Sequence, residues 1–574
     1  MHNFLKGLNK EQQDACCSES NIVLTACPGS GKTRTVTYRL AYMQKAHPES
    51  RKLNVAITYT NRAADEIAER LDEFDVETEK IWVGTIHQFC MNFIIRPYSM
   101  YSDRLKKGYC VIDEYIRDEY AHELAKELGV DTGYKSPLTS PLVKDAYRNR
   151  LRENKEIDFD DILELSYEML LQHQFIAENI ASIISSIQVD EYQDTQELQY
   201  LILSLILRSD KNIKISFVGD RNQAIYGGLG GVAKTTEELE TLFETTFEEK
   251  SLTECYRSTQ VIVDFYRKFA VCPVSIRSMY YAQEAEDIHH KTNISKDEVA
   301  QYIAEVINDL LEKGISEDDI CVVAPQWWLI FPVVEQLRKL LPTLKFDAPD
   351  ISPFKYDPLN PFYLIAKLTF TCAGTMSKAR RRWANEIINI IVDDYGISLP
   401  EYYDAYHLMK AVNLSRMMTG TDGLECYRAS VKRVMDSMRL DLSNEKRLNE
   451  CYCRFMEKTN SRIKKHKIPC SCQDFYASFN ERTGLVVNTI HGVKGEEYNT
   501  VIAFGLLNGY LPHWDNIIND EDAGRMVADK LLFVLCSRAK ERIYLISEKG
   551  RNTKKGTELR ATSELCRVVS EMEV

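Results

Sequence analysis

A glycine-rich loop near the amino end contains residue types that could handle phosphate groups. The stretch ACPGSGKTRT spans residues 26–35, after a short apolar run at 21–26 and before a segment with helical spacing of its apolar residues. A strand, a tight loop and a helix cradle a nucleoside triphosphate, because the glycines let backbone N–H groups approach the phosphates. Lys32 would place a cation at the β- and γ-phosphates, and Thr33 would offer a hydroxyl to Mg²⁺. The predicted nucleotide-binding residues are Ala26, Cys27, Pro28, Gly29, Ser30, Gly31, Lys32 and Thr33.

The second half of such a site is an acidic pair that follows a buried strand. In IISSIQVDEYQDT, residues 183–195, the apolar run ends at Val189, and Asp190 and Glu191 follow directly. A buried parallel strand would place Asp190 at the carboxyl edge of the sheet, where it could hold Mg²⁺, and Glu191 could polarise the attacking water. The alternative, a solvated acidic turn, does not account for the buried strand or for the phosphate loop. The chemistry indicated is hydrolysis of a nucleoside triphosphate.

Strands that alternate with helices must position these residues, which predicts an α/β protein with parallel sheets. The 574 residues are 44% hydrophobic and 27% charged, a globular composition that allows several domains. The formal net charge of −13 does not exclude DNA, since a local basic groove matters more than the total. The apolar runs are short and the first residues have no apolar signal core, so we expect no membrane span. The 16 cysteines then fit free thiols in the cytoplasm.

The acidic stretch VDEYQDT resembles the second motif of superfamily 1A helicases, the UvrD/PcrA/Rep group. The family's other motifs appear in order between Leu8 and about Ala539, which makes the resemblance specific. They are LNKEQ for the Q motif, ITYTNRAADEI (57–67) for motif Ia, GTIHQF (84–89) for Ib, IDFDDIL (157–163) before motif II, VGDRNQAIYG for III, LTECYRS for IV, TIHGVKGEEY for V and FVLCSRAKE for VI.

This resemblance implies two RecA-like parallel-sheet lobes, each interrupted by a mainly α-helical insertion, in the 1A/1B/2A/2B arrangement. We expect lobe 1A at 1–90 and 185–245, insertion 1B at 91–184, lobe 2A at 246–345 and 481–574, and insertion 2B at 346–480. The proline-rich segment 347–361 marks the entrance to the second insertion.

The resemblance also assigns further residues to ATP and to its hydrolysis. Gln12 would read the adenine, Arg34 would lie beside the base or ribose, and Tyr256 would stack on the adenine. Gln223 would sense the γ-phosphate, and Glu497 would touch the nucleotide from motif V. Arg257 and Arg538 would be arginine fingers from the second lobe, stabilising charge on the transferring phosphoryl group. Because these arginines lie far in sequence from Lys32, the site is expected to be split between two lobes that ATP draws together.

Single-stranded DNA is the ligand along which the protein is expected to move. Hydroxyls, amides and imidazoles bond phosphates, and aromatic rings stack on bases. By resemblance, the residues that line the strand are Tyr59, Asn61, Thr85, His87, Tyr226, Thr489 and His491.

Three basic clusters are candidates for duplex contact, although a charge run is usually a solvated face. They are Arg148, Arg150 and Arg152 in the first insertion, Arg380, Arg381 and Arg382 beside Trp383 in the second, and Lys464, Lys465 and Lys467.

The function implied is that of an ATP-dependent, Mg²⁺-dependent helicase that translocates 3′→5′ on single-stranded DNA. The alternative is a DNA-sensing regulatory ATPase subunit that controls a partner nuclease without processive unwinding. The build also resembles the helicase subunits of Gabija-type anti-phage systems, which partner an OLD-family nuclease. That analogy leaves open whether the role is repair or antiviral defence.

Motif III departs from the family pattern. Gly228 stands where the family has a base-stacking aromatic, and Leu229 stands where it has an arginine. A glycine removes a π-face and adds flexibility, so we expect hydrolysis to survive and coupling to strand movement to weaken.

Four cysteines could hold zinc or an iron–sulfur cluster, with His466 lying between the pairs. They are Cys451, Cys453, Cys470 and Cys472. Their C-x-C spacing differs from the usual C-x2-C spacing of zinc sites, and ordinary reduced thiols are the favoured interpretation.

Overall fold

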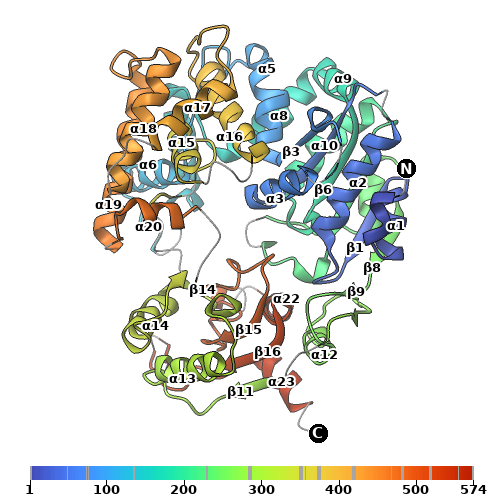
Figure 1. The fold of residues 1–574 in the computed structure, drawn as a ribbon, viewed down its shortest axis with the longest axis vertical. Coiled ribbons are helices and arrows are strands. Elements are labelled where there is room, and N and C mark those ends of the chain that lie inside the picture. The colour runs from blue at the N-terminus through green and yellow to red at the C-terminus, as the bar shows by residue number, and fades with distance from the viewer. Residues whose placement is uncertain are drawn as a thin grey trace.

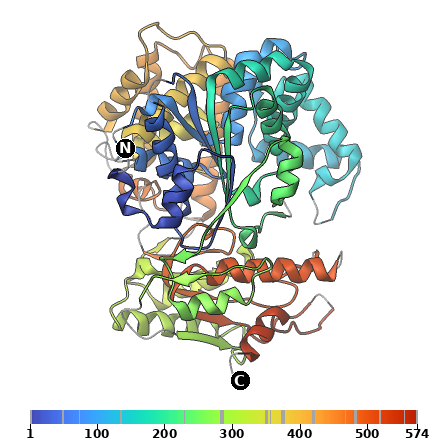
Figure 2. The ribbon, with the colours of Figure 1, turned by 90° about the vertical axis from the view of Figure 1, so that its right-hand side faces the viewer.

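The computed structural model describes residues 3–47, 50–72, 74, 76–133, 136–227, 230–281, 287–347, 353–355, 357–371, 377–416, 422–466, 468–479, 484–515, 520–553 and 555–571. Two parallel six-stranded sheets form separate bodies, with the N-terminal end of the chain on one and the C-terminal end on the other (Figures 1 and 2). Within the described residues, no helix is both long enough and apolar enough to cross a bilayer.

The first sheet has the order β3-β2-β6-β7-β1-β8, and every neighbouring pair is parallel. Its strands are β1 (Ile22–Ala26), β2 (Leu53–Thr58), β3 (Ile81–Thr85), β6 (Ile184–Asp190), β7 (Lys214–Gly219) and β8 (Glu248–Leu252). One face is covered by α1 (Lys10–Cys17), α2 (Lys32–Ala46) and α3 (Asn61–Asp72), and the other by α8 (Phe159–Gln172), α9 (Gln174–Ile183) and α10 (Glu197–Ser209).

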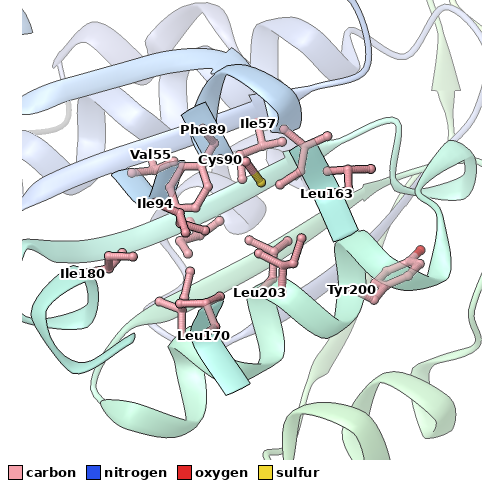
Figure 3. Packing of buried hydrophobic residues seen from close by; sticks show 14 of the residues in the cluster. Val55, Ile57, Phe89, Cys90, Ile94, Leu163, Leu170, Ile180, Tyr200 and Leu203 are labelled. Atoms are coloured by element: carbon pink, nitrogen blue, oxygen red, sulfur yellow. The ribbon is translucent and has the colours of Figure 1, made fainter. Parts of the chain in front are cut away.

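The largest core of this lobe lies between the sheet and α8–α10. Side chains alternate along β2, so Val55 and Ile57 point into this core while Ala56 points toward α2 and α3. Leu163 from α8 and Leu203 from α10 lie in the same core, and Figure 3 shows these side chains together with Phe89 and Cys90 of α4 (Ile86–Cys90). This packing buries both faces of a parallel sheet, as such sheets require.

The second sheet has the order β11-β16-β15-β12-β14-β13 and is parallel throughout. Its strands are β11 (Asp287–Lys291), β12 (Ile320–Ala324), β13 (Phe346–Asp347), β14 (Leu485–Thr489), β15 (Tyr498–Ala503) and β16 (Ala539–Ile546). One face packs on α13 (Val299–Glu312) and α14 (Trp327–Leu340), and the other on α12 (Gln260–Arg267), α22 (Glu521–Cys536) and α23 (Ser563–Ser570). The two sheets confirm the predicted α/β class with two parallel-sheet lobes.

Two helical segments stand outside the sheets. Between β3 and β6, α6 (Glu114–Glu127) and α7 (Pro141–Asn154) form a small core of their own. Between β13 and β14, a larger core is built by α15 (Pro361–Phe370), α16 (Ser377–Asn389), α17 (Ala405–Arg416), α18 (Gly423–Met438), α19 (Lys446–His466) and α20 (Cys472–Ala477). In Figure 1 this second group lies against the first lobe, although it is inserted into the second.

Two segments differ from the expected boundaries. Strand β8 lies beyond residue 245, yet it pairs in parallel with β1 and completes the first sheet. Helices α8 and α9 fall within 91–184, yet they cover the first sheet. In both cases packing partners that are distant in the sequence decide the lobe to which a segment belongs.

Buried ion pairs hold the second helical group on the first lobe. Arg96 in α5 (Arg96–Tyr98) lies 2.9 Å from Asp394 and 3.0 Å from Glu386, and all three side chains are at most 10% exposed. Asp65 of α3 pairs with Lys367 at 2.8 Å and also with Arg382. Because a buried charge that loses its partner is strongly destabilising, these pairs hold the two surfaces in register.

Replacing Arg96 with alanine is expected to lower the free energy of unfolding by about 3–5 kcal/mol, because two buried carboxylates lose their cation. Urea unfolding of the purified chain measures this effect. Arg148→Ala is the matched control, since its pair with Glu164 is 39% and 44% exposed and is expected to contribute less than about 1 kcal/mol. Equal effects of the two changes would contradict a structural role for the Arg96 cluster.

Candidate nucleotide and strand-binding site

The phosphate loop joins β1 to α2 as predicted, with Gly31 immediately before the helix at φ 76°. Gly29 has φ 73°, and a Cβ at this position would lie 2.5 Å from Cβ of Arg257. A Cβ at Gly31 would lie 2.9 Å from Nε2 of Gln12. Both positions therefore require glycine, for backbone conformation and for space. The loop ends at the N-terminus of α2, where unpaired N–H groups favour an anion such as a phosphate.

Lys32 and the acidic pair meet at this loop. Nζ of Lys32 lies 2.5 Å from Oε1 of Glu191, and Asp190 ends β6 with 3% of its surface exposed. Burial and the adjacent Glu191 carboxylate raise the pKa of Asp190. Burial would also raise the pKa of Glu191, but the cations of Lys32 and Lys494 outweigh it and lower that pKa. The carboxylate of Asp190 and the hydroxyl of Thr33 are oxygen donors of the kind that Mg²⁺ prefers, so these residues fit the ion.

Residues from the second lobe complete the phosphate end of the site. Nη2 of Arg538 donates to Oε1 of Gln223 at 3.0 Å, and Arg538 is 1% exposed. Burial, with the nearby Arg257 cation, lowers the pKa of Arg538 to about 9. Arg257 donates from Nε to Glu497 at 2.9 Å and from Nη1 to the carbonyl oxygen of Ser537 at 3.0 Å. The structure thus brings together Gln223, Arg257, Glu497 and Arg538 although they span more than half the chain.

The residues that are expected to contact the adenine base lie beside the phosphate loop and make hydrogen bonds there. Nε2 of Gln12 donates to the carbonyl oxygen of Ser30 at 2.9 Å. Asn9 donates to the hydroxyl of Tyr256 at 3.0 Å, and Tyr256 is 44% exposed. Arg34 donates to the carbonyl oxygen of Gly7 at 3.1 Å. Oε1 of Gln12 accepts the backbone N–H of Asn9 at 3.0 Å, so Gln12 and Tyr256 share one hydrogen-bonded chain through Asn9.

Tyr59, Tyr226 and His491 form a continuous row of rings. The rings of Tyr59 and Tyr226 stack with centroids 5.0 Å apart, and the rings of Tyr226 and His491 lie 5.5 Å apart. The hydroxyl of Tyr226 donates to the carbonyl oxygen of His491 at 3.3 Å, which joins the two lobes. Tyr59 is 39% exposed, so the row has an open end that a base can reach.

The other predicted strand contacts are less open. Thr85 and Thr489 are buried, and their hydroxyls accept backbone N–H groups of Gln88 and Gly492, at 3.3 and 3.2 Å. Burial lowers the pKa of His87 to about 4, so it is neutral at pH 7. Asn61 begins α3 and lines a small cavity against α15 and α16. Gly228 and Leu229 lie outside the described residues.

Lys494 is a functional candidate that sequence reasoning missed. Its Nζ lies 2.5 Å from Oδ2 of Asp194, donates to the carbonyl oxygen of Gln223 at 2.8 Å, and sits 5.0 Å from the centroid of the Tyr226 ring. Asp194 is 1% exposed and belongs to the acidic stretch, so this single cation contacts that stretch, the segment of Gln223 that is expected to sense the γ-phosphate, and the ring row. Its position inside TIHGVKGEEY, between His491 and Glu497, was the available signal.

We expect Lys494→Met to reduce the stimulation of ATP hydrolysis by single-stranded DNA at least about fivefold, the lower end of usual coupling between sites, and to change the basal rate less than the stimulation. The reason is that Tyr226 and Asp194 lose the cation that links them. ATPase rates with and without oligothymidine, beside a melting curve, measure this. Lys549→Met, on an exposed side chain of the same lobe, is the control. If single-stranded DNA stimulates the ATPase activity of Lys494→Met as strongly as that of the parent, the charge of Lys494 does not couple the two sites.

The structure buries some residues of the three basic clusters and leaves others at the surface. Arg380 is 2% exposed and donates to the carbonyl oxygens of Leu368 and Thr371, so the duplex role predicted for it is wrong in this conformation. Arg382 is tied to Asp65, and the buried Trp383 donates to the same carboxylate at 3.1 Å. These contacts to Asp65 hold α16 against α3, because a buried carboxylate binds nearby cations strongly.

The remaining basic side chains are at the surface. Arg148 pairs with Glu164, Arg150 pairs with Glu123 at 2.9 Å, and Arg152, Arg381 and Lys464 are exposed. The side chain of Lys465 and the whole of Lys467 lie outside the described residues.

Of the four cysteines considered for a metal, Cys451 and Cys453 lie in α19, Cys470 lies between α19 and α20, and Cys472 begins α20. Cys453 is exposed, Cys472 donates to the carbonyl oxygen of Asp422 at 3.4 Å, and the side chain of His466 is outside the described part. In that part, no three His, Cys, Asp or Glu side chains are grouped so as to hold a metal ion.

Known proteins are similar to this chain in sequence, over part or nearly all of its length. A family model described as an AAA domain matches residues 9–229. The ATP-dependent DNA helicase PcrA of Staphylococcus aureus (strain Mu50 / ATCC 700699) is 22% identical, over 95% of this chain and 84% of that protein. PcrA of S. aureus (strain MRSA252) is 29% identical over 46% of this chain and 40% of its own length, and PcrA of Staphylococcus epidermidis (strain ATCC 12228 / FDA PCI 1200) is 28% identical over the same shares. With its ordered motifs and two parallel-sheet lobes, the chain is similar to the UvrD/PcrA-like helicases of superfamily 1.

Proposed function

We propose that the protein is an ATP-dependent DNA helicase that moves 3′→5′ along single-stranded DNA. The observation that supports this most is the cross-lobe network in which Lys494 contacts Asp194, Gln223 and the ring of Tyr226. A hydrolysis site and a base-stacking row that share one cation cannot change independently, because neither can shift without moving the other's partner. The direction of movement is proposed from the family resemblance.

The chain's own residues would act in a defined order. Lys32 would leave Glu191 and bind the phosphates, while Asp190 and Thr33 would hold Mg²⁺, whose charge neutralises the phosphate oxygens. Glu191, once released, would orient the attacking water. Arg257 and Arg538 would stabilise charge on the transferring phosphoryl group, and product release would let the lobes separate. Movement of Tyr226 relative to Tyr59 would then open and close the place where a base stacks.

A strand-displacement assay beside an ATPase assay tests the proposal. A labelled duplex with a 3′ single-stranded tail should be separated with ATP and Mg²⁺, and one with a 5′ tail should not. DNA-stimulated ATPase activity without displacement of either duplex would favour the second candidate function, a DNA-sensing regulatory ATPase.

That second candidate has one specific feature in its favour. The sequence has Gly228 and Leu229 where the family has an aromatic and an arginine that couple hydrolysis to strand movement. A regulatory subunit of this kind would act on a partner, and the OLD-family nuclease of Gabija-type systems is the candidate partner by analogy. Co-purification from cells that express both proteins, with and without ATP, tests the pairing.

A further inference from the structure

A hydrogen-bonded group of side chains joins the start of α1 to strand β9 (Glu254–Cys255), beside the expected adenine site. Oε2 of Glu254 accepts the hydroxyl of Tyr256 at 2.6 Å and Nδ2 of Asn9 at 2.8 Å. Nδ2 of Asn9 also donates to the hydroxyl of Tyr256 at 3.0 Å. The three side chains therefore form a closed triangle, in which one carboxylate oxygen holds a tyrosine and an asparagine that is 245 residues away from Glu254 in the sequence.

The carboxylate of Glu254 restrains the ring of Tyr256. The backbone N–H of Tyr256 donates to the carbonyl oxygen of Gly29 at 2.9 Å, so its backbone is held at the phosphate loop. Its side chain is 44% exposed and is restrained separately, through the hydroxyl. A hydrogen bond to an ionised carboxylate is about twice as strong as one between neutral groups. A base that stacks on this ring does not have to immobilise it, which preserves binding free energy for the nucleotide.

A second contact joins the same two segments without Glu254. Oε1 of Glu11 accepts the hydroxyl of Thr253 at 2.6 Å, and Oε2 of Glu11 accepts the backbone N–H of Thr253 at 2.7 Å. This two-point contact sets the approach of the backbones. The carboxylate of Glu254 is thus left to orient side chains, and its removal is expected to leave the two segments in place.

Asn9 links the triangle to Gln12. Oδ1 of Asn9 accepts the backbone N–H of Gln12 at 2.8 Å, and the backbone N–H of Asn9 donates to Oε1 of Gln12 at 3.0 Å. Nε2 of Gln12 donates to the carbonyl oxygen of Ser30 at 2.9 Å. A flipped amide would bring two donors together at Asn9 and two acceptors together at Ser30, so the orientation of the amide is fixed. In that orientation it can accept from N6 and donate to N7 of adenine, whereas guanine presents acceptors at both positions.

We propose that Glu254 is a positioning residue of the ATP site, which orients Tyr256 for stacking on the base, holds Asn9 behind Gln12, and thereby favours adenine over guanine. The inference rests on the proposed function, because it takes the base to lie against Tyr256 and Gln12. Glu254 acts through these side chains and not on the phosphates. Its loss is therefore expected to weaken nucleotide binding and to leave the chemical step intact.

Glu254→Ala tests this role through the kinetics of hydrolysis. The KM for ATP, and the dissociation constant of a non-hydrolysable ATP analogue, should each rise about 3- to 10-fold, the usual effect of leaving a side chain to be ordered by its ligand. The kcat should stay at its parental value. Glu254→Gln, whose amide oxygen still accepts a hydrogen bond, should have an intermediate KM. The ratio of the KM for GTP to the KM for ATP should fall in Glu254→Ala, because Asn9 and Gln12 lose part of their restraint.

Tyr256→Phe removes the hydroxyl and keeps the ring. It should raise the KM for ATP without changing the GTP-to-ATP ratio, because Asn9 keeps its bond to Glu254. In the double variant with Glu254→Ala, the rise in KM should be smaller than the product of the two single effects, since both changes break the same hydrogen bond. Single effects that multiply would overturn the proposal.

Glu248→Ala is the matched control, because Glu248 is an exposed carboxylate on β8 that accepts the hydroxyl of Ser18 at 3.0 Å. It should keep the parental KM and nucleotide preference. The proposal is overturned if Glu254→Ala is parental in both, or if it lowers kcat and the melting temperature together, the result of a merely structural role. These outcomes leave the proposed function standing, whereas a parental protein that binds no ATP would overturn that function itself.

Discussion

Glu191→Gln is expected to stop ATP turnover while ATP binding persists. The amide keeps the shape of the side chain but cannot orient or deprotonate the attacking water, which usually costs about 10²–10⁴ in rate. Affinity for ATP should be at least parental, because Nζ of Lys32 lies 2.5 Å from Glu191 and must leave that ion pair before it binds the phosphates. Steady-state hydrolysis and equilibrium binding of a fluorescent ATP analogue measure the two effects separately.

Two further variants provide comparisons for Glu191→Gln. Lys32→Ala should lose hydrolysis and binding together, because the phosphates lose their cation. Glu197→Gln makes the same chemical change at a half-exposed residue that pairs with Lys234, and it should behave as the parent. Parental turnover in Glu191→Gln would mean that another group orients the water, and the acidic pair would then be misassigned.

Arg257→Ala and Arg538→Ala should each lower the ATPase rate constant about 10³-fold or more, with a much smaller effect on ATP binding. Arginine fingers act on charge that develops only in the transition state, so their loss is felt in turnover. The structure supports this assignment, because Arg538 donates to Gln223 across the lobes and Arg257 lies against Gly29 of the phosphate loop. Single-turnover hydrolysis beside nucleotide titration gives the comparison.

Arg538 is buried, so its removal can also disturb packing, and a melting curve is needed for each variant. Arg538→Lys keeps the charge without the planar fork and should remain strongly impaired. Arg525→Ala removes an arginine that is 59% exposed and pairs within its own helix, and it should be neutral. If Arg257→Ala and Arg538→Ala both turn over ATP at the parental rate, the hydrolysis site is not shared between the lobes.

The sequence by itself determined the features that depend on neighbours along the chain. The order strand, glycine loop and helix around Lys32 follows from local patterns, and the same is true of Asp190 at the end of a buried strand. These predictions agree with the structure because a few neighbouring residues determine the backbone conformation at Gly29 and Gly31 and the hydrophobic strand before Asp190. The ordered motifs added Gln223, Arg257 and Arg538, which the structure places together at the lobe interface.

Only the tertiary structure decided what depends on partners distant in the sequence. Arg380 is indistinguishable from a surface cation in the sequence, yet it is buried because α16 packs on α15 and its guanidinium bonds carbonyl oxygens there. Lys494 gained its significance from Asp194, 300 residues away. Burial and pairing are properties of surfaces that meet after folding, which is why periodicity and motif spacing did not reveal them.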